Sequence, residues 1–177
     1  EAASIAGHWR LSNLVWLYDD NRITIDGSTD LAFSENVALR FESMGWRVIK
    51  VDGHSADEVR GALKDAGNDA VYPTLVICRT HIGYGSPNKV DTSASHGAPL
   101  GSDELANTRS SLGWEHEPFE VPTEVRAYFE KSQSRKRSEA AEWRAEFESW
   151  SARHPSLRRS FDDSLSSTVP HELAEKL

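Results

Sequence analysis

The stretch LVWLYDDNRITIDGS, residues 14–28, passes abruptly from apolar side chains to a cluster of oxygen-bearing ones. Its apolar half is short and continuous, which is typical of a strand covered on both faces in a parallel sheet. Asp19, Asp20 and Asn21 follow at the point where that strand ends. Because ligands of open α/β sheets gather at the carboxyl ends of strands, the stretch predicts both a fold class and the place of its site.

The same pattern continues on the C-terminal side of this stretch. WRVIKV, residues 46–51, and TLVICRT, residues 74–80, are two further apolar runs that predict strands. Helices are expected between and before them, with Ser34 capping one that ends at Gly45. The expected helices span residues 2–9, 34–44 and 56–66. Strands alternating with helices in this order predict a doubly wound α/β domain with a parallel sheet.

A long polar segment, residues 80–102, follows the last predicted strand and reads THIGYGSPNKVDTSASHGAPLGS. It is too long and too rich in Gly, Ser and Pro to serve only as a connection, so we expect a functional loop. A further helix is expected to begin at Ser102 and to end near Gly113.

The composition changes after residue 121, where charged residues surround apolar ones at helical spacing. Trp143, Phe147 and Trp150 form one such stripe, which predicts a helix that docks on a neighbour. Leu157, Phe161 and Leu165 repeat the spacing in the next segment. We therefore expect an α/β part over residues 1–121 and a helical part over residues 122–177.

Charge and cysteine content exclude several classes of protein. The chain has 28 acidic and 20 basic residues, a net charge of −8, so we expect no nucleic-acid partner. No apolar run is long enough to span a membrane, and we expect no membrane association. The single cysteine, Cys78, lies in an apolar run and is interpreted as a buried thiol in a reducing compartment. These features predict a cytoplasmic protein.

The oxygen donors after the first strand suit a hard divalent cation such as Mg²⁺, which commonly shares its shell with phosphate oxygens. A P-loop nucleotide hydrolase would also place acids there, but the chain lacks the G-x-x-x-x-G-K-[ST] loop. GYGSPN begins a dinucleotide-binding pattern without completing it. The alternative in which Asn21 is only a turn residue, with its side chain bonded locally, stays open at this point.

His96 is the histidine whose context singles it out for function. Gly97 and Pro99 restrict the backbone beside it, and an imidazole can donate a hydrogen bond to a phosphate or to a developing alkoxide. A purely structural role is the competing interpretation.

Five segments, taken in order and spacing, resemble transketolase, a thiamine-diphosphate-dependent enzyme. They are YDDNRITIDG, WRVIKVDGH, CRTHIGYGSPNK, SHGAPLG and LGWEHEPFEVP. The resemblance implies a thiamine-diphosphate-binding fold, with residues 1–121 as the C-terminal part of the diphosphate-binding domain. Residues 122–177 are then a helical linker toward a pyrimidine-binding domain that this chain lacks.

The resemblance also implies roles for individual residues. The amide oxygen of Asn21 and the backbone carbonyl of Ile23 would ligate a divalent ion, Mg²⁺ or Ca²⁺, that bridges the two phosphates of the cofactor. Ile25 and Ile82 would pack against the rings of thiamine diphosphate. His96 would contact the diphosphate and a hydroxyl group of the donor substrate, and it is one of two expected catalytic residues.

The second expected catalytic residue is Glu1. It matches a glutamate of the acidic network that joins the two cofactor sites of a homodimer in this family. Ser93 is a departure, since many family members carry a histidine at that position. The family's Gly-Asp-Gly triplet, which supplies a further metal ligand, would precede Glu1. We therefore expect a fragment.

The function that the resemblance implies is transfer of a two-carbon ketol unit from a ketose phosphate to an aldose phosphate. The isolated chain is expected to be inactive, because the residues that activate the cofactor's pyrimidine would lie outside it. The alternative is a noncatalytic binding or assembly module, or one portion of a split thiamine-diphosphate enzyme.

Overall fold

A computed structural model describes residues 1–68, 71–166, 169 and 173 of the chain. These residues form two units, Glu1–Glu115 and His116–Leu177, and each is described by itself. The end of the predicted helical part, beyond residue 166, lies largely outside the described residues.

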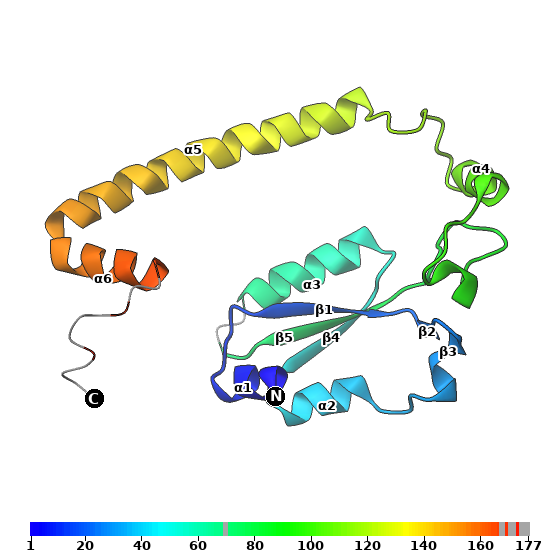
Figure 1. The fold of residues 1–177 in the computed structure, drawn as a ribbon, viewed down its shortest axis with the longest axis horizontal. Coiled ribbons are helices and arrows are strands. Elements are labelled where there is room, and N and C mark those ends of the chain that lie inside the picture. Colours follow the sequence, from blue (N-terminus) through cyan, green and yellow to red (C-terminus); the bar gives the residue numbers. More distant parts are fainter. Residues whose placement is uncertain (69–70, 167–168, 170–172, 174–177) are drawn as a thin grey trace. The chain divides into compact units, whose positions relative to one another are not determined.

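Unit 1 is built on a sheet of three parallel strands, β1 (Val15–Asp20), β4 (Arg47–Asp52) and β5 (Thr74–Arg79), in the order β1-β5-β4 (Figure 1). Asp20 and Asp52 both lie opposite Arg79, so the three strands end at the same level. β5 is buried almost throughout because it pairs on both sides and is covered on both faces.

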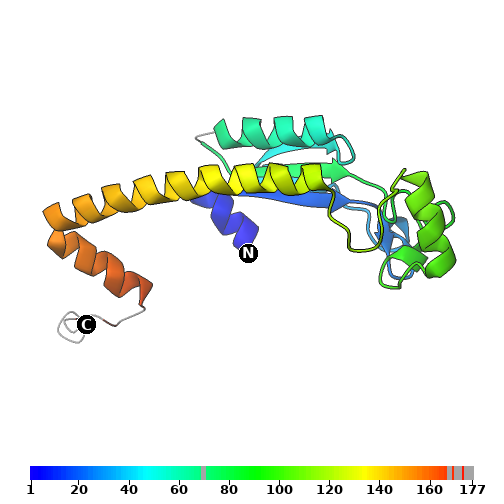
Figure 2. The same cartoon turned by 90° about the horizontal axis from the view of Figure 1, so that it is seen from above.

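Helices cover both faces of this sheet, as Figures 1 and 2 show. α1 (Ala2–His8) and α2 (Val37–Ser43) lie on one face, where Leu75 and Ile77 join a core with Trp46. α3 (Ala56–Asn68) lies on the other face, over Val76 and Cys78. The alternation of buried β5 side chains between two cores confirms the predicted α/β class with a parallel sheet.

The structure corrects the prediction for the first strand. β1 begins at Val15 and includes both Asp19 and Asp20, which therefore belong to the strand and not to the turn after it. It was also predicted to be covered on both faces, but it is an edge strand of the described sheet, and Leu17 is 54% exposed. A continuous apolar run shows only that a segment is hydrophobic. It does not distinguish an edge strand from a central strand, because both can contain such a run.

Two local features of the segment between β1 and β4 differ from the prediction. Asn36, and not Ser34, caps α2, because its Oδ1 accepts a hydrogen bond from the Leu39 amide at 3.1 Å. A two-stranded hairpin, β2 (Ile23–Thr24) with β3 (Gly27–Ser28), directly follows β1 and leads into the 3₁₀ turn η1 (Thr29–Leu31).

The predicted functional loop after β5 is irregular apart from a 3₁₀ turn, η2 (Ser93–Ser95). α4 (Ser102–Ser111) follows and closes unit 1. The loop therefore connects the carboxyl end of the central strand, β5, to the start of α4.

Unit 2 contains α5 (Thr123–Arg153) and α6 (Pro155–Leu165), two helices joined at His154. Phe147 contacts Phe161 across the two helices, with ring centroids 5.5 Å apart, and Arg158 lies over the Phe147 ring. The predicted stripe thus packs α6 on α5, as expected, although Trp143 and Leu165 remain exposed.

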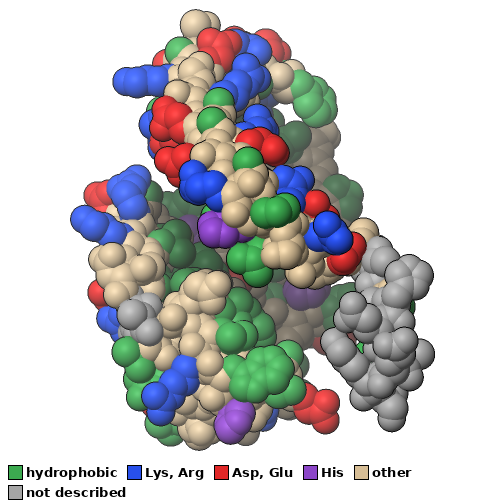
Figure 3. Space-filling model, turned by 90° about the vertical axis from the view of Figure 1, so that its left-hand side faces the viewer, with side chains coloured by type: hydrophobic (Ala, Val, Ile, Leu, Met, Phe, Trp, Pro, Cys, Tyr) green, Lys and Arg blue, Asp and Glu red, His purple; other side chains and the backbone are tan. Residues whose placement is uncertain are grey.

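Charged side chains of both signs are interspersed on the face shown in Figure 3. In α5, Arg135 forms an ion pair with Glu139 at 2.7 Å on an exposed face of the helix. Among the described residues, none of the helices combines the length and the apolar character needed to cross a membrane. The predicted boundary at residue 121 stays a prediction.

The packing of α1 against the turn before β4 generates the first prediction. A side chain at Gly7 would collide with the backbone carbonyl of Met44, whereas Gly61 in α3 has open space around it. Gly7→Ala should therefore lower the free energy of unfolding by about 2 kcal/mol or more. Gly61→Ala should raise it by roughly 0.5–1 kcal/mol, because alanine is the better helix former.

Urea unfolding of the 177-residue chain, followed by tryptophan fluorescence and circular dichroism, measures both changes. Equal stability of the two variants would contradict the close approach of α1 to Met44.

Candidate functional site

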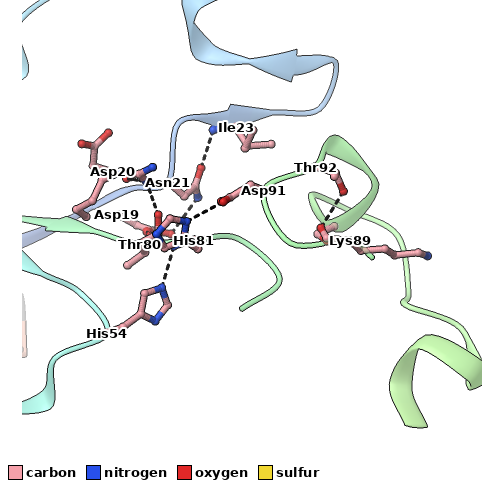
Figure 4. A network of polar contacts seen from close by, with 12 residues as sticks. Asp19, Asp20, Asn21, Ile23, His54, Thr80, His81, Lys89, Asp91 and Thr92 are labelled. Carbon is pink, nitrogen blue, oxygen red and sulfur yellow. Dashed lines mark hydrogen bonds and ion pairs between the residues drawn. The ribbon is translucent and has the colours of Figure 1, made fainter. Parts of the chain in front are cut away.

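The turn after β1 is built around the side chain of Asn21. Its Oδ1 accepts a hydrogen bond from the Ile23 amide at 2.9 Å, and its Nδ2 donates to Asp19 Oδ2 at 3.1 Å (Figure 4). Arg22 between them has a φ of 61°, which lets the chain reverse into β2. Asn21 therefore makes the local hydrogen bonds that the sequence left open as a possibility. These bonds fix which way its side-chain amide faces.

Hydrogen bonds join the carboxyl ends of β1 and β5. The hydroxyl of Thr80 donates to Asp19 Oδ1, and Arg79 Nη1 donates to the carbonyl oxygen of Asp20 at 2.9 Å. The two strands pair in parallel, so their last residues lie side by side although they are far apart in sequence. Asn21 therefore lies beside the start of the loop that follows β5.

Two histidines lie at the same edge of the sheet, one after β4 and one after β5. His54 Nε2 accepts a hydrogen bond from the His81 amide at 2.8 Å, and the His54 ring stacks on Tyr84 at 4.0 Å. His81 Nδ1 lies 2.7 Å from Asp91 Oδ2, and Figure 4 shows this pair close to the Asn21 turn. These contacts hold the first part of the loop against the ends of β4 and β5.

Glu104 in the first turn of α4 anchors the middle of the loop. Its carboxylate accepts hydrogen bonds from the Ser86 hydroxyl and from the backbone and side-chain nitrogens of Asn88, both at 2.8 Å. Ser86 and Glu104 are buried. These donors favour the charged form and lower the pKa of Glu104 from 4.5 to about 2.

A second set of bonds shapes the part of the loop that carries His96. The carbonyl oxygen of Lys89 accepts from the hydroxyls of Thr92 and Ser95, and Lys89 Nζ donates to the Leu100 carbonyl at 2.9 Å. His96 ends η2 and donates its amide to the Ser93 carbonyl at 3.0 Å, and its side chain is exposed. Ser93 acts here through its backbone.

The remaining predicted residues are placed as follows. Ile25 forms the tip of the β2–β3 hairpin and is 70% exposed, while Ile82 is half-buried in the loop after β5. Both therefore belong to segments that leave the carboxyl ends of strands. Glu1 precedes α1, whose Ala3 carbonyl accepts from Trp46 Nε1 at the opening of β4, so the structure does not bring Glu1 to the Asn21 turn.

A pocket of about 550 Å³ lies on the α2 side of the sheet. Tyr18, Asp20 and Arg79 are among its lining residues, but Asn21, Ile25 and His96 are not. These three predicted residues therefore lie outside this pocket.

Several carboxylates influence the groups near the carboxyl end of β1. Burial raises the pKa of the Tyr18 hydroxyl, and the nearby carboxylates of Asp20, Glu35 and Asp19 raise it further. Burial likewise raises the pKa of the Cys78 thiol, with a further contribution from Asp19. These carboxylates are partly offset by arginine, because Arg22 Nε lies 3.8 Å from Asp20 Oδ2.

The donors at this edge fit part of the shell of a hard divalent ion. Asn21 Oδ1 has a second lone pair besides the one that accepts from Ile23, and amide and carbonyl oxygens are suitable ligands. Within the described part of the chain, His, Cys, Asp and Glu side chains form no group of three or more that could bind a metal. The candidate metal ligands in this part of the chain are therefore the side-chain oxygen of Asn21 and a backbone carbonyl oxygen.

The fold and this edge define a class: a parallel α/β domain whose candidate site residues follow the carboxyl ends of its strands. The family model described as "Transketolase, thiamine diphosphate binding domain" matches residues 1–170. A transketolase from Nostoc sp. is 46% identical over 168 residues, which cover 94% of this chain and 25% of the relative. The chloroplastic transketolase-1 of Arabidopsis thaliana is 42% identical over 172 residues, covering 96% and 23%.

Solved structures agree with the sequence relatives. Transketolase from Pichia stipitis, in a complex with sedoheptulose-7-phosphate, superposes with a TM-score of 0.88 at 34% identity, covering 96% of this chain and 25% of that one. Transketolase from Leishmania mexicana gives 0.90 at 32% identity, covering 99% and 27%. The chain belongs to the transketolase family, and it spans about a quarter of the length of these relatives.

Sequence reasoning missed several residues of this edge. It did not single out His54, His81 or Asp91. It gave no role to Thr80 or Glu104. The signal available for Glu104 was a carboxylate in the first turn of a helix directly after a polar loop, which is a common anchoring position.

The bonds to Glu104 generate a prediction for pH dependence. In the unfolded chain this carboxylate takes up its proton at an ordinary pKa, whereas the folded value is about 2. Its contribution to stability is therefore complete above the unfolded pKa of about 4.5 and is lost as the pH falls toward 2. Glu104→Gln should flatten the decline of stability in this window and should also lower stability at neutral pH.

Urea unfolding of the 177-residue chain and its variants between pH 2 and 7 tests this expectation. Glu42→Gln, on the exposed surface of α2, is the matched control and should leave the pH dependence as in the parent chain. A Glu104→Gln variant with the full parent slope would refute the assignment.

Proposed function

We propose that this chain supplies part of a transketolase that transfers a two-carbon ketol unit from a ketose phosphate to an aldose phosphate. The reaction uses thiamine diphosphate and a divalent metal, Mg²⁺ or Ca²⁺. The observation that carries the proposal is the oxygen-bearing Asn21 turn at the carboxyl end of β1, in a chain that belongs to this family.

Asn21 and Ile23 would hold the metal. The amide oxygen of Asn21 and the backbone carbonyl of Ile23 are hard donors two residues apart in a turn with fixed bonding, and the carboxylates nearby would attract a cation. The ion would offset the charge of the diphosphate, which these carboxylates would otherwise repel. The remaining ligands come from outside the described residues, from the diphosphate or from water.

The apolar side chains of Ile25 and Ile82 would pack against the cofactor rings. Ile25 is largely exposed at a hairpin tip, so covering it with a ring removes apolar surface from water. When bound, thiamine diphosphate supplies a nucleophilic carbon and an electron sink. His96 would donate a hydrogen bond to the diphosphate and to the donor substrate, from a loop that Glu104 and Lys89 hold in shape.

The proposal extends to the assembly and the location of the protein. Glu1 would act in an acidic network across a homodimer, which is compatible with its position away from the Asn21 turn. The free, buried thiol of Cys78 fits a reducing compartment, and we propose the cytoplasm.

A chimera tests the function directly. In this chimera the chain replaces the segment of the Nostoc transketolase that it matches. The chimera should catalyse ketol transfer between sugar phosphates, and its activity should require thiamine diphosphate and Mg²⁺. The isolated 177-residue chain should be inactive. A folded chimera that fails to bind the cofactor would refute the proposal and favour a noncatalytic binding or assembly module.

Removing the proposed metal ligand gives a sharper expectation. Asn21→Ala in the chimera should raise the Mg²⁺ concentration needed for half-maximal cofactor binding by about 100-fold, because a metal oxygen is lost. Calorimetry with thiamine diphosphate at a series of Mg²⁺ concentrations measures it.

Asn36→Ala is the matched control for Asn21→Ala, since Asn36 also accepts a backbone hydrogen bond but caps α2. It should leave the Mg²⁺ requirement unchanged. If Asn21→Ala behaves in the same way, Asn21 is a turn residue only.

Removing the imidazole of His96 should affect the chemical step more than cofactor binding. His96→Ala in the chimera removes a donor whose hydrogen bond strengthens as charge develops on the substrate oxygen, so turnover should fall by about 100-fold. The measurement is turnover at saturating thiamine diphosphate and Mg²⁺, with the ketose donor varied. His8→Ala, on the exposed end of α1, is the control. Turnover equal to that of the control would assign His96 a structural role.

A further inference from the structure

The carboxylate of Asp19 connects two strands that are distant in sequence. One oxygen accepts the hydroxyl of Thr80, at the end of β5, and the other accepts the side-chain nitrogen of Asn21, after β1 (Figure 4). We call Asp19 and Thr80, with these two bonds, the strand-end clasp. It is the contact through which the end of β5 reaches the Asn21 side chain.

The clasp determines which way the Asn21 amide faces. An ionised carboxylate only accepts hydrogen bonds, so Asp19 must face the nitrogen of the amide and not its oxygen. The Ile23 amide donates to the oxygen from the other side, at 2.9 Å. A reversed amide would set oxygen against carboxylate and nitrogen against an N–H group, and both contacts would be repulsive. The amide oxygen is thereby held toward residue 23.

Thr80 is itself held tightly in place. Its amide donates to the Asp20 carbonyl at 3.4 Å, and the chain after β4 lies directly against its methyl group. A side chain at Gly53 would collide with that methyl group, so this approach requires glycine. Gly53 also donates its amide to the Arg79 carbonyl at 2.8 Å. The hydroxyl of Thr80 is therefore positioned by both β1 and the turn after β4.

We propose that Asp19 and Thr80 are positioning residues for the metal-binding oxygen of Asn21. The proposal rests on the function proposed above, in which Asn21 ligates the divalent ion of thiamine diphosphate. The clasp would act before the ion arrives, because it holds the amide in the orientation that binding requires and removes the cost of turning it. Neither residue would touch the metal or the substrate.

The chimera allows each half of the clasp to be removed separately. Thr80→Val has nearly the same shape as threonine but lacks the hydroxyl, whereas Thr80→Ser keeps the hydroxyl and loses the methyl group. Asp19→Asn keeps the shape, but its single amide oxygen can accept a hydrogen bond from only one of Thr80 and Asn21 at a time. Asp26→Asn, in the β2–β3 turn, is the control for the change of charge.

The measurement is the Mg²⁺ concentration for half-maximal binding of thiamine diphosphate, determined by calorimetry without any substrate. Thr80→Val and Asp19→Asn should each raise it about tenfold, the usual lower range for residues that support a metal ligand. Thr80→Ser and Asp26→Asn should stay within about twofold of the parent chimera. Melting of the cofactor-free chimeras by circular dichroism shows whether each variant is folded.

Two outcomes would overturn the proposal in distinguishable ways. If Asn21→Ala raises the Mg²⁺ requirement but folded Thr80→Val and Asp19→Asn do not, the clasp has no positioning role and the metal assignment stands. If Asn21→Ala has no effect either, the metal assignment falls together with the clasp. A rise for Thr80→Ser equal to that for Thr80→Val would also overturn it, because the hydroxyl would then be irrelevant.

Discussion

Parallel pairing on both sides of β5 is the constraint on which the arrangement of unit 1 depends. Three strands that run in the same direction and end level bring the segments after them to one edge of the sheet. Covering β5 on both faces requires helices on both faces, and the connections between parallel strands supply them. The Asn21 turn, the His54 turn and the start of the loop after β5 meet for this reason.

Much of this framework could be predicted from apolar runs and turn residues. β4 and β5 are short apolar segments separated by a helix with charged residues, and their positions agree with expectation to within a residue or two. Exposure of β1 could not be predicted, because a run of apolar residues carries no information about which neighbours lie beside it. Ser34 and Asn36 are both good capping residues, so only the geometry of α2 separates them.

In the candidate site, too, some features could be predicted from the sequence and others could not. That Asn21 follows a strand end is a local property, and the sequence predicts it. The contact of Asp19 with Thr80 depends on the register of β1 against β5, which places Asp19 opposite Cys78. The ring contacts of His54 with His81 and Tyr84 depend on β4 lying beside β5. Such contacts between distant segments follow from strand order and not from any single motif.

The two interpretations of Asn21, as a turn residue and as a metal ligand, prove to be compatible. A turn residue uses one lone pair of its amide oxygen to accept a backbone N–H, and Asn21 does this with Ile23. The second lone pair is not used by that bond, and the Asp19 carboxylate keeps the nitrogen facing the other way. Under the proposed function, the local bonding that makes Asn21 an ordinary turn residue would therefore also fix an oxygen donor for a cation. An unbonded asparagine would have to lose rotamer freedom on binding a metal, so the turn would make Asn21 a better ligand and would not compete with the proposed role.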